Sequence, residues 1–95
     1  MKTEVVNIHR THCEVYIGRA GKGQSGYFGN PFQLGSEEVR GATIARYREY
    51  FLERIDTDPE FKRRVLSLRG KRLGCFCHPL PCHGDVIVEW LEGQP

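Results

Sequence analysis

The sequence contains no long hydrophobic run and no recognisable secretory signal. A membrane-spanning helix needs roughly 20 predominantly apolar residues in succession, and no segment approaches that length. Residues 1–5 also lack the apolar stretch and small-residue cleavage site of a secretory signal. We therefore expect no membrane contact and a cytoplasmic, reducing location. There the four cysteines are expected to be thiols or metal ligands rather than two disulfides.

The net charge of the chain is also small. The chain carries 14 Lys and Arg against 12 Asp and Glu, a formal charge of +2, so its composition does not require a polyanionic partner. The hydrophobic share of 39% is typical of a folded protein and excludes disorder, and 95 residues predict one domain spanning residues 1–95. Positive charge is concentrated in one segment, which contains Lys62, Arg63, Arg64, Arg69, Lys71 and Arg72. Such a cluster predicts either a nucleic-acid-binding surface or a solvated helix face.

Hydrophobic periodicity and capping residues predict an alternation of strands and helices. The expected elements are strands at 4–9 and 13–17, helices at 36–55 and 58–70, a strand at 71–77 and a helix at about 82–92. Ser36 precedes two glutamates, and Asp58 precedes proline and glutamate, as in capped helix starts. The first helix would bury Ile44, Tyr47, Phe51, Leu52 and Ile55. This order predicts a small layered α/β domain, with a short, mostly parallel sheet flanked by about three helices.

The most distinctive segment is the Cys/His turn, residues 75–85, which reads CFCHPLPCHGD. It joins the end of the last predicted strand to the start of the last predicted helix. In open α/β sheets, ligands bind at the carboxyl ends of the strands, against helix N-termini. We therefore expect any chemistry of the protein at this turn.

Three interpretations of the turn remain open. In the first, Cys82 and His83 perform nucleophilic or acid–base chemistry, because a helix N-terminus lowers the pKa of a thiol. Asp85 would then orient a histidine, as the third member of a catalytic triad does. The second interpretation is a zinc site made of Cys75, Cys77, Cys82 and His83, with His78 as a substitute. Its spacing is unusual, because a single residue separates the two strand cysteines. In the third, the cysteines are unreactive core residues, which we favour for Cys75.

A glycine-rich loop, residues 18–35, follows the second predicted strand. It carries Arg19, a candidate for binding an anion, but it lacks both the Walker and the dinucleotide fingerprints. Its aromatic residues between glycines, with Phe32 among them, suit either stacking on a planar group or packing into the core. The amide of Asn30 is able to pair with a base or ribose edge.

Three separated motifs agree in order with one known family. They are Val15-Tyr16-Ile17-Gly18-Arg19, then Gly29-Asn30-Pro31-Phe32, then the run from Gly70 through Cys75, Cys77, Pro79, Cys82, His83 and Gly84 to Asp85. In these motifs the chain resembles the bacterial and phage domain-of-unknown-function family 4326, from about Val15 to Leu91. Family members carry tryptophan where this chain has Phe28 and Phe76. The resemblance supplies no activity. It implies that Arg19, Asn30, Cys75, Cys77, Cys82, His83 and Asp85 occupy motif positions.

The leading hypothesis is a pocket, in an enzyme or derived from one, for a small phosphate- or nucleotide-bearing ligand. Arg19 and the helix N-terminus at Cys82–Gly84 would hold the anion, and Asn30 and Phe32 would hold the planar part. Catalysis would fall to Cys82, His83 and Asp85. On that hypothesis, alanine at Cys82 or His83 abolishes turnover and leaves the melting temperature nearly unchanged. The alternative is a zinc-stabilised nucleic-acid- or protein-binding module, whose basic face would be residues 62–72.

Overall fold

The computed structural model describes residues 2–18, 26–29, 31, 40–75 and 82–95. Its elements are β1 (Glu4–Asn7), β2 (Val15–Tyr16), α1 (Arg40–Thr57), α2 (Pro59–Leu66), β3 (Arg72–Cys75) and α3 (Gly84–Glu92). Over these residues the predicted α/β class is confirmed, with three helices beside a short parallel sheet. The predicted helix start at Ser36 and the strand residues 76 and 77 lie outside the described residues.

The sheet has the strand order β1-β3-β2, and β3 pairs in parallel with both neighbours. Leu73 at its centre is in register with Val5 on one side and Val15 on the other. β1 is shorter than predicted because the Asn7 side chain accepts a hydrogen bond from the backbone N–H of His9 at 2.8 Å. Such local side-chain bonds turn the chain out of a strand. β2 is likewise shorter than the predicted segment 13–17.

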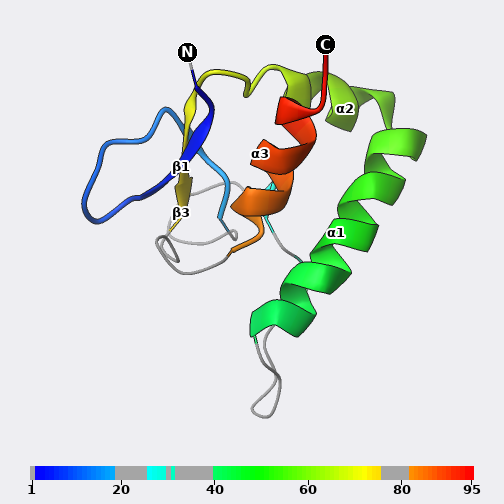
Figure 1. The fold of residues 1–95 in the computed structure, drawn as a ribbon, viewed down its shortest axis with the longest axis horizontal. Coiled ribbons are helices and arrows are strands. Elements are labelled where there is room, and N and C mark those ends of the chain that lie inside the picture. The colour runs from blue at the N-terminus through cyan, green and yellow to red at the C-terminus, as the bar shows by residue number, and fades with distance from the viewer. Residues whose placement is uncertain (1, 19–25, 30, 32–39, 76–81) are drawn as a thin grey trace.

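The helices form layers on one side of the sheet. In Figure 1, α3 lies between the sheet and α1, and α2 lies at one end of both helices. Among the described residues, the fully buried side chains of the core include Ile17, Tyr47, Phe51, Phe61, Leu73 and Ile87. The prediction that Leu52 is buried is wrong, since 48% of it is exposed. The buried face of α1 is narrow there, and one helical step past Phe51 turns a side chain about 100° away.

The start of α2 agrees with its sequence signal, and its end does not. Asp58 accepts a hydrogen bond from the N–H of Phe61, and Pro59 is the first helical residue. The helix ends at Leu66 instead of continuing to Gly70. Gly70 adopts a φ of 78° in the turn before β3, and its N–H donates to Thr3 Oγ1 at 2.6 Å. Among the described residues, no helix is long and apolar enough to cross a bilayer.

Candidate functional site

The carboxyl ends of β2 and β3 meet the start of α3 at one corner of the fold. β3 ends at Cys75, and the Sγ atom of Cys75 lies 3.4 Å from that of Cys82, just before α3. Ile17 follows β2, and its carbonyl oxygen lies 2.6 Å from Nε2 of His83. The start of the last helix is therefore attached to the end of β3, as the sequence led us to expect, and also to the end of β2, which the sequence did not predict. We call this region the β2/β3/α3 corner.

His83 is held at the corner by its ring. Because a backbone carbonyl only accepts hydrogen bonds, Nε2 must carry the hydrogen that it shares with Ile17. In the neutral ring Nδ1 then carries the lone pair. The imidazole also meets the Tyr47 ring edge to face, with the centroids 5.0 Å apart. The residue is 8% exposed, so its ring is part of the packed interior.

The Cys82 thiol is protonated more firmly than the sequence suggested. The pKa of Cys82 is raised, first by its hydrogen bond with Cys75 and then by burial, which disfavours the thiolate. The N–H of Gly84 acts in the opposite direction, as expected at a helix N-terminus, but it is outweighed. The expected lowering of the pKa of this thiol is therefore wrong. Cys82 is 2% exposed, and a buried neutral thiol is a poor nucleophile.

Gly84 lies in a space that no side chain would fit. A Cβ atom at this position would come within 2.7 Å of Ile17 Cδ1 and 2.9 Å of Val5 Cγ2. Because such close contacts are strongly repulsive, glycine is required for α3 to approach the sheet this closely. Packing accounts for this glycine without a ligand.

Asp85 connects the first turn of α3 to Cys82, two residues before the helix begins. Its Oδ2 atom accepts a hydrogen bond from the backbone N–H of Cys82 at 3.1 Å, and its own N–H donates to the Cys82 carbonyl at 3.0 Å. A carboxylate in this position accepts a hydrogen bond from an N–H group at the helix start, and the positive end of the helix dipole stabilises its negative charge. Asp85 is exposed, so the carboxylate also remains accessible to solvent.

The aromatic residues Tyr27 and Phe28 pack against the helices. Both rings contact Phe61, with centroid distances of 5.8 and 6.2 Å. The Tyr47 hydroxyl donates to the carbonyl of Phe28 at 3.0 Å, and Arg54 donates to the carbonyl of Tyr27 at 3.3 Å. Of the two interpretations from the sequence, these contacts favour packing for Tyr27 and Phe28.

Tyr47 and Arg54 are the residues that the sequence analysis missed. Tyr47 joins the segment 26–29 to His83, since its hydroxyl contacts one and its ring the other. Burial raises the pKa of Tyr47, so its hydroxyl stays a donor. A tyrosine within an apolar helix face was the available signal, because a buried phenol hydroxyl requires a partner. Arg54, whose guanidinium lies 4.8 Å from the Tyr27 ring centre, gave no such signal.

Several predicted site residues cannot be placed. Arg19, Asn30, Phe32, Cys77 and His78 lie outside the described residues. Within the described ranges, no group of three or more Cys, His, Asp or Glu side chains is arranged to hold a metal ion. Cys13, which lacked a predicted role, contacts the position of Gly74, where a Cβ atom would collide with its sulfur.

Comparison with known proteins agrees with the motifs. The profile of the family "Domain of unknown function (DUF4326)" matches residues 2–93. A relative from Enterobacteria phage T4, named "Uncharacterized 12.4 kDa protein in nrdA-td intergenic region", is 40% identical over 84 residues. The alignment covers 88% of this chain and 72% of the relative. No solved structure gave a significant match. The chain belongs to the DUF4326 family, as its three motifs suggested.

Proposed function

We propose that the protein binds a small phosphate-bearing ligand, such as a nucleotide, at the β2/β3/α3 corner. The observation that carries the proposal is the contact between His83 Nε2 and the Ile17 carbonyl, 2.6 Å long, which attaches the end of one strand to the start of α3. In parallel α/β sheets, ligands bind where strand carboxyl ends face a helix N-terminus. The positive end of the α3 dipole favours an anion there.

The proposal assigns binding to the ends of the strands and support to the buried residues. Gly18 leads directly into Arg19, the cation expected from the sequence to meet the phosphate, and Asn30 and Phe32 are expected to hold the planar part. Cys82 and His83 are buried, and we assign them the role of fixing the start of α3. We therefore propose binding, without assigning a covalent step to the thiol.

Titration of ¹⁵N-labelled protein with AMP, adenosine and inorganic phosphate tests the proposal. We expect AMP and phosphate to shift the amide signals of residues 82–86, and adenosine alone to shift them far less. Arg19→Gln should weaken AMP binding by about tenfold or more, because it removes a charge-assisted hydrogen bond. Arg10→Gln is the matched control, since Arg10 is an exposed arginine in the turn after β1. The absence of binding at millimolar AMP, or equal losses in both variants, would contradict the proposal.

The second candidate is a zinc site, and one distance favours it. Two thiolates on one tetrahedral zinc with bonds of about 2.3 Å lie roughly 3.8 Å apart. The Sγ atoms of Cys75 and Cys82 are 3.4 Å apart, which is close to that separation. The set expected from the sequence also includes Cys77 and His83, but its described members, Cys75, Cys82 and His83, are not arranged to hold one metal ion together, so His83 would have to move. His83 would have to use Nδ1, because Nε2 donates to Ile17.

Metal analysis separates the two candidates. A zinc protein should purify with about one zinc ion per chain, and a chelator should lower its melting temperature. Cys75→Ser and Cys82→Ser should lose the metal, whereas Cys13→Ser should retain it. Protein that is free of metal and insensitive to chelators excludes this candidate and leaves the phosphate-binding proposal standing.

The basic face gives the zinc candidate little support as a nucleic-acid module. Arg63 and Arg64 both pair with Glu60 on the same helix. Together they lower the pKa of Glu60 to about 2, so this carboxylate stays charged at neutral pH. Part of the positive charge expected to meet phosphates is therefore balanced within α2 itself. These pairs favour the interpretation as a solvated helix face.

A further inference from the structure

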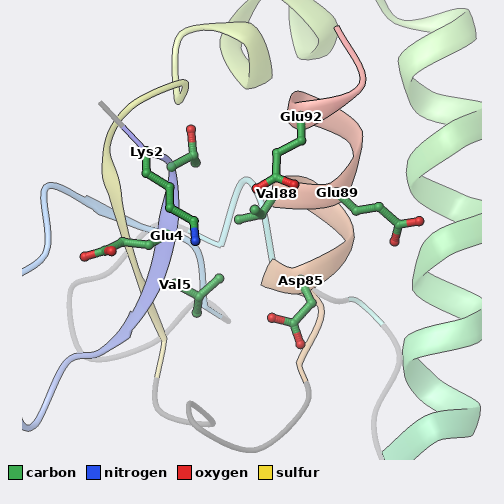
Figure 2. A pocket seen from close by; sticks show the side chains of 8 residues that line it. Lys2, Glu4, Val5, Asp85, Val88, Glu89 and Glu92 are labelled. Atoms are coloured by element: carbon green, nitrogen blue, oxygen red, sulfur yellow. The ribbon is translucent and has the colours of Figure 1, made fainter.

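A groove with a volume of about 460 Å³ runs between β1 and α3. Lys2, Glu4 and Val5 line it from the strand, and Asp85, Val88 and Glu92 line it from the helix. Figure 2 shows these side chains on facing elements, with β1 on one side and α3 on the other. The groove thus has a strand as one wall and a helix as the other.

The strand wall is the edge of the sheet. In the described chain β1 pairs with β3 alone, so its other side has no strand beside it. The N–H groups of Glu4 and Ile8 donate to the carbonyls of Lys71 and Cys75 of the β3 segment. In a parallel ladder the residues between such pairs direct their N–H and C=O groups away from the partner strand. The backbone of Val5 is therefore directed toward the open edge, where this residue lines the groove.

The helix wall is acidic. Asp85, Val88 and Glu92 are spaced three and four residues apart, which places them on one face of α3. Asp85 and Glu92 thus place two carboxylates along the helix wall against the ammonium group of Lys2, whereas Glu4 points away from α3 in Figure 2 and lies 4.0 Å from Arg72 of β3. Glu89 points toward α1 in Figure 2 and pairs with Arg48 at 2.8 Å. The protein as a whole has a charge of +2, so the groove has the opposite sign to its surroundings.

We propose that this groove binds an extended, basic peptide segment of a partner protein, which adds to β1 as a further strand. An unpaired strand beside a helix is the arrangement used when peptides bind by strand addition, with backbone hydrogen bonds giving affinity and alternate side chains giving specificity. Lysine or arginine at every second position would face the carboxylates of Asp85 and Glu92. Asp85 belongs to both regions, but this inference rests on the open edge of β1, which the phosphate site does not use.

Fluorescence anisotropy with designed hexapeptides tests the inference. The probe alternates lysine and valine, and its counterpart alternates glutamate and valine. We expect the lysine peptide to bind, the glutamate peptide not to bind, and added salt to weaken binding. Two N-methylated lysine peptides are the sharpest control, because alternate N–H groups face β1. Methylation on one alternate set should abolish binding, and methylation on the other should leave it nearly unchanged. Equal effects of both would show non-specific attraction and overturn the inference.

Matched charge variants locate the binding surface. Glu92→Gln should weaken binding of the lysine peptide by about two- to fivefold, as expected for an exposed charge pair. Glu49→Gln removes the same charge from an exposed position on α1 and should leave binding unchanged. Equal losses in the two variants would overturn the inference. A concentration-dependent dimer that excludes the peptide would also overturn it, by showing that a second copy of this chain occupies the edge.

Discussion

Crowding around Gly84 determines how closely α3 approaches the sheet. The sequence analysis had placed Gly84 among the residues that would hold an anion, whereas the structure places Ile17 and Val5 directly against it. Both residues lie in the core formed by the strands and helices. A glycine required by packing and a glycine required by ligand binding look the same in a sequence. Only the neighbouring residues in the structure distinguish the two cases.

Replacing Gly84 by alanine should lower the free energy of unfolding by about 1–3 kcal/mol, because the new methyl group overfills the space. Ile17→Val removes Cδ1, the atom nearest to that methyl group, so the double variant should lose less than the sum of the two single variants. Gly93→Ala is the control, since its Cβ would meet nothing closer than 3.5 Å. Urea unfolding of the wild-type protein and the four variants measures these free energies. A double variant whose loss equals the sum of the two single losses would contradict this account.

The burial of His83 changes what its substitution should do. The sequence led us to expect an alanine variant with an unchanged melting temperature. His83→Ala instead leaves the Ile17 carbonyl without its donor and a cavity beside Tyr47, and should lower the free energy of unfolding by about 2–4 kcal/mol. His12→Ala, at an exposed position, should change it by less than about 0.5 kcal/mol. A stable His83→Ala protein would return His83 to the list of candidates for a purely chemical role.

At the scale of elements, signals confined to a few neighbouring residues predicted the structure best. Asp58, Pro59 and Glu60 marked the start of α2 because a cap, its proline and the N–H that it binds are all local. The turn that follows this helix includes Gly70, whose N–H bonds to Thr3 near the other end of the chain. No local pattern reports a partner so distant in sequence.

The α2 cap offers a test at this scale. Asp58→Ala should lower the free energy of unfolding by about 1 kcal/mol, because the N–H of Phe61 loses its acceptor. Asp58→Asn keeps an oxygen at the same place and should retain most of the stability, although it gives up the 3.5 Å ion pair with Arg54. Asp56→Ala removes an exposed carboxylate near the end of α1 and should have little effect. If asparagine were as damaging as alanine, the ion pair would be the more important contact.

In the candidate site, as in the helices and strands, features set by neighbouring residues could be predicted from the sequence and long-range contacts could not. The position of Cys82 and His83 beside a strand end could be predicted, because strand, turn and helix follow one another directly in the sequence. The state of the Cys82 thiol could not, because it depends on Cys75 across the corner and on burial by the whole core. Likewise, the contacts of Tyr47 with Phe28 and His83 could not be predicted, because they depend on where α1 packs in the fold.

At the scale of the whole molecule, the interior formed by the described residues holds acidic groups in their neutral forms, with Tyr47 and Cys82 among them. Burial raises the pKa of Tyr47, and the contact with Cys75 together with burial raises that of Cys82. An unfolded chain would release these protons at ordinary values of about 10 for tyrosine and about 8.5 for cysteine. Above these values the folded state binds more protons than the unfolded state, so the free energy of unfolding must fall as the pH rises.

The free energy of unfolding of the metal-free protein should therefore decline above about pH 8.5, with Cys82 contributing a slope of up to about 1.4 kcal/mol per pH unit. Above about pH 10, Tyr47 adds a decline of the same sign. Urea unfolding at a series of pH values, with a reductant and a chelator present, measures the slope. Cys82→Ser removes the thiol and should flatten the curve between pH 8.5 and 10. Parallel slopes in the two proteins would mean that the Cys82 thiol ionises as readily in the fold as in water, and the corner would then be far more open to solvent than its packing implies.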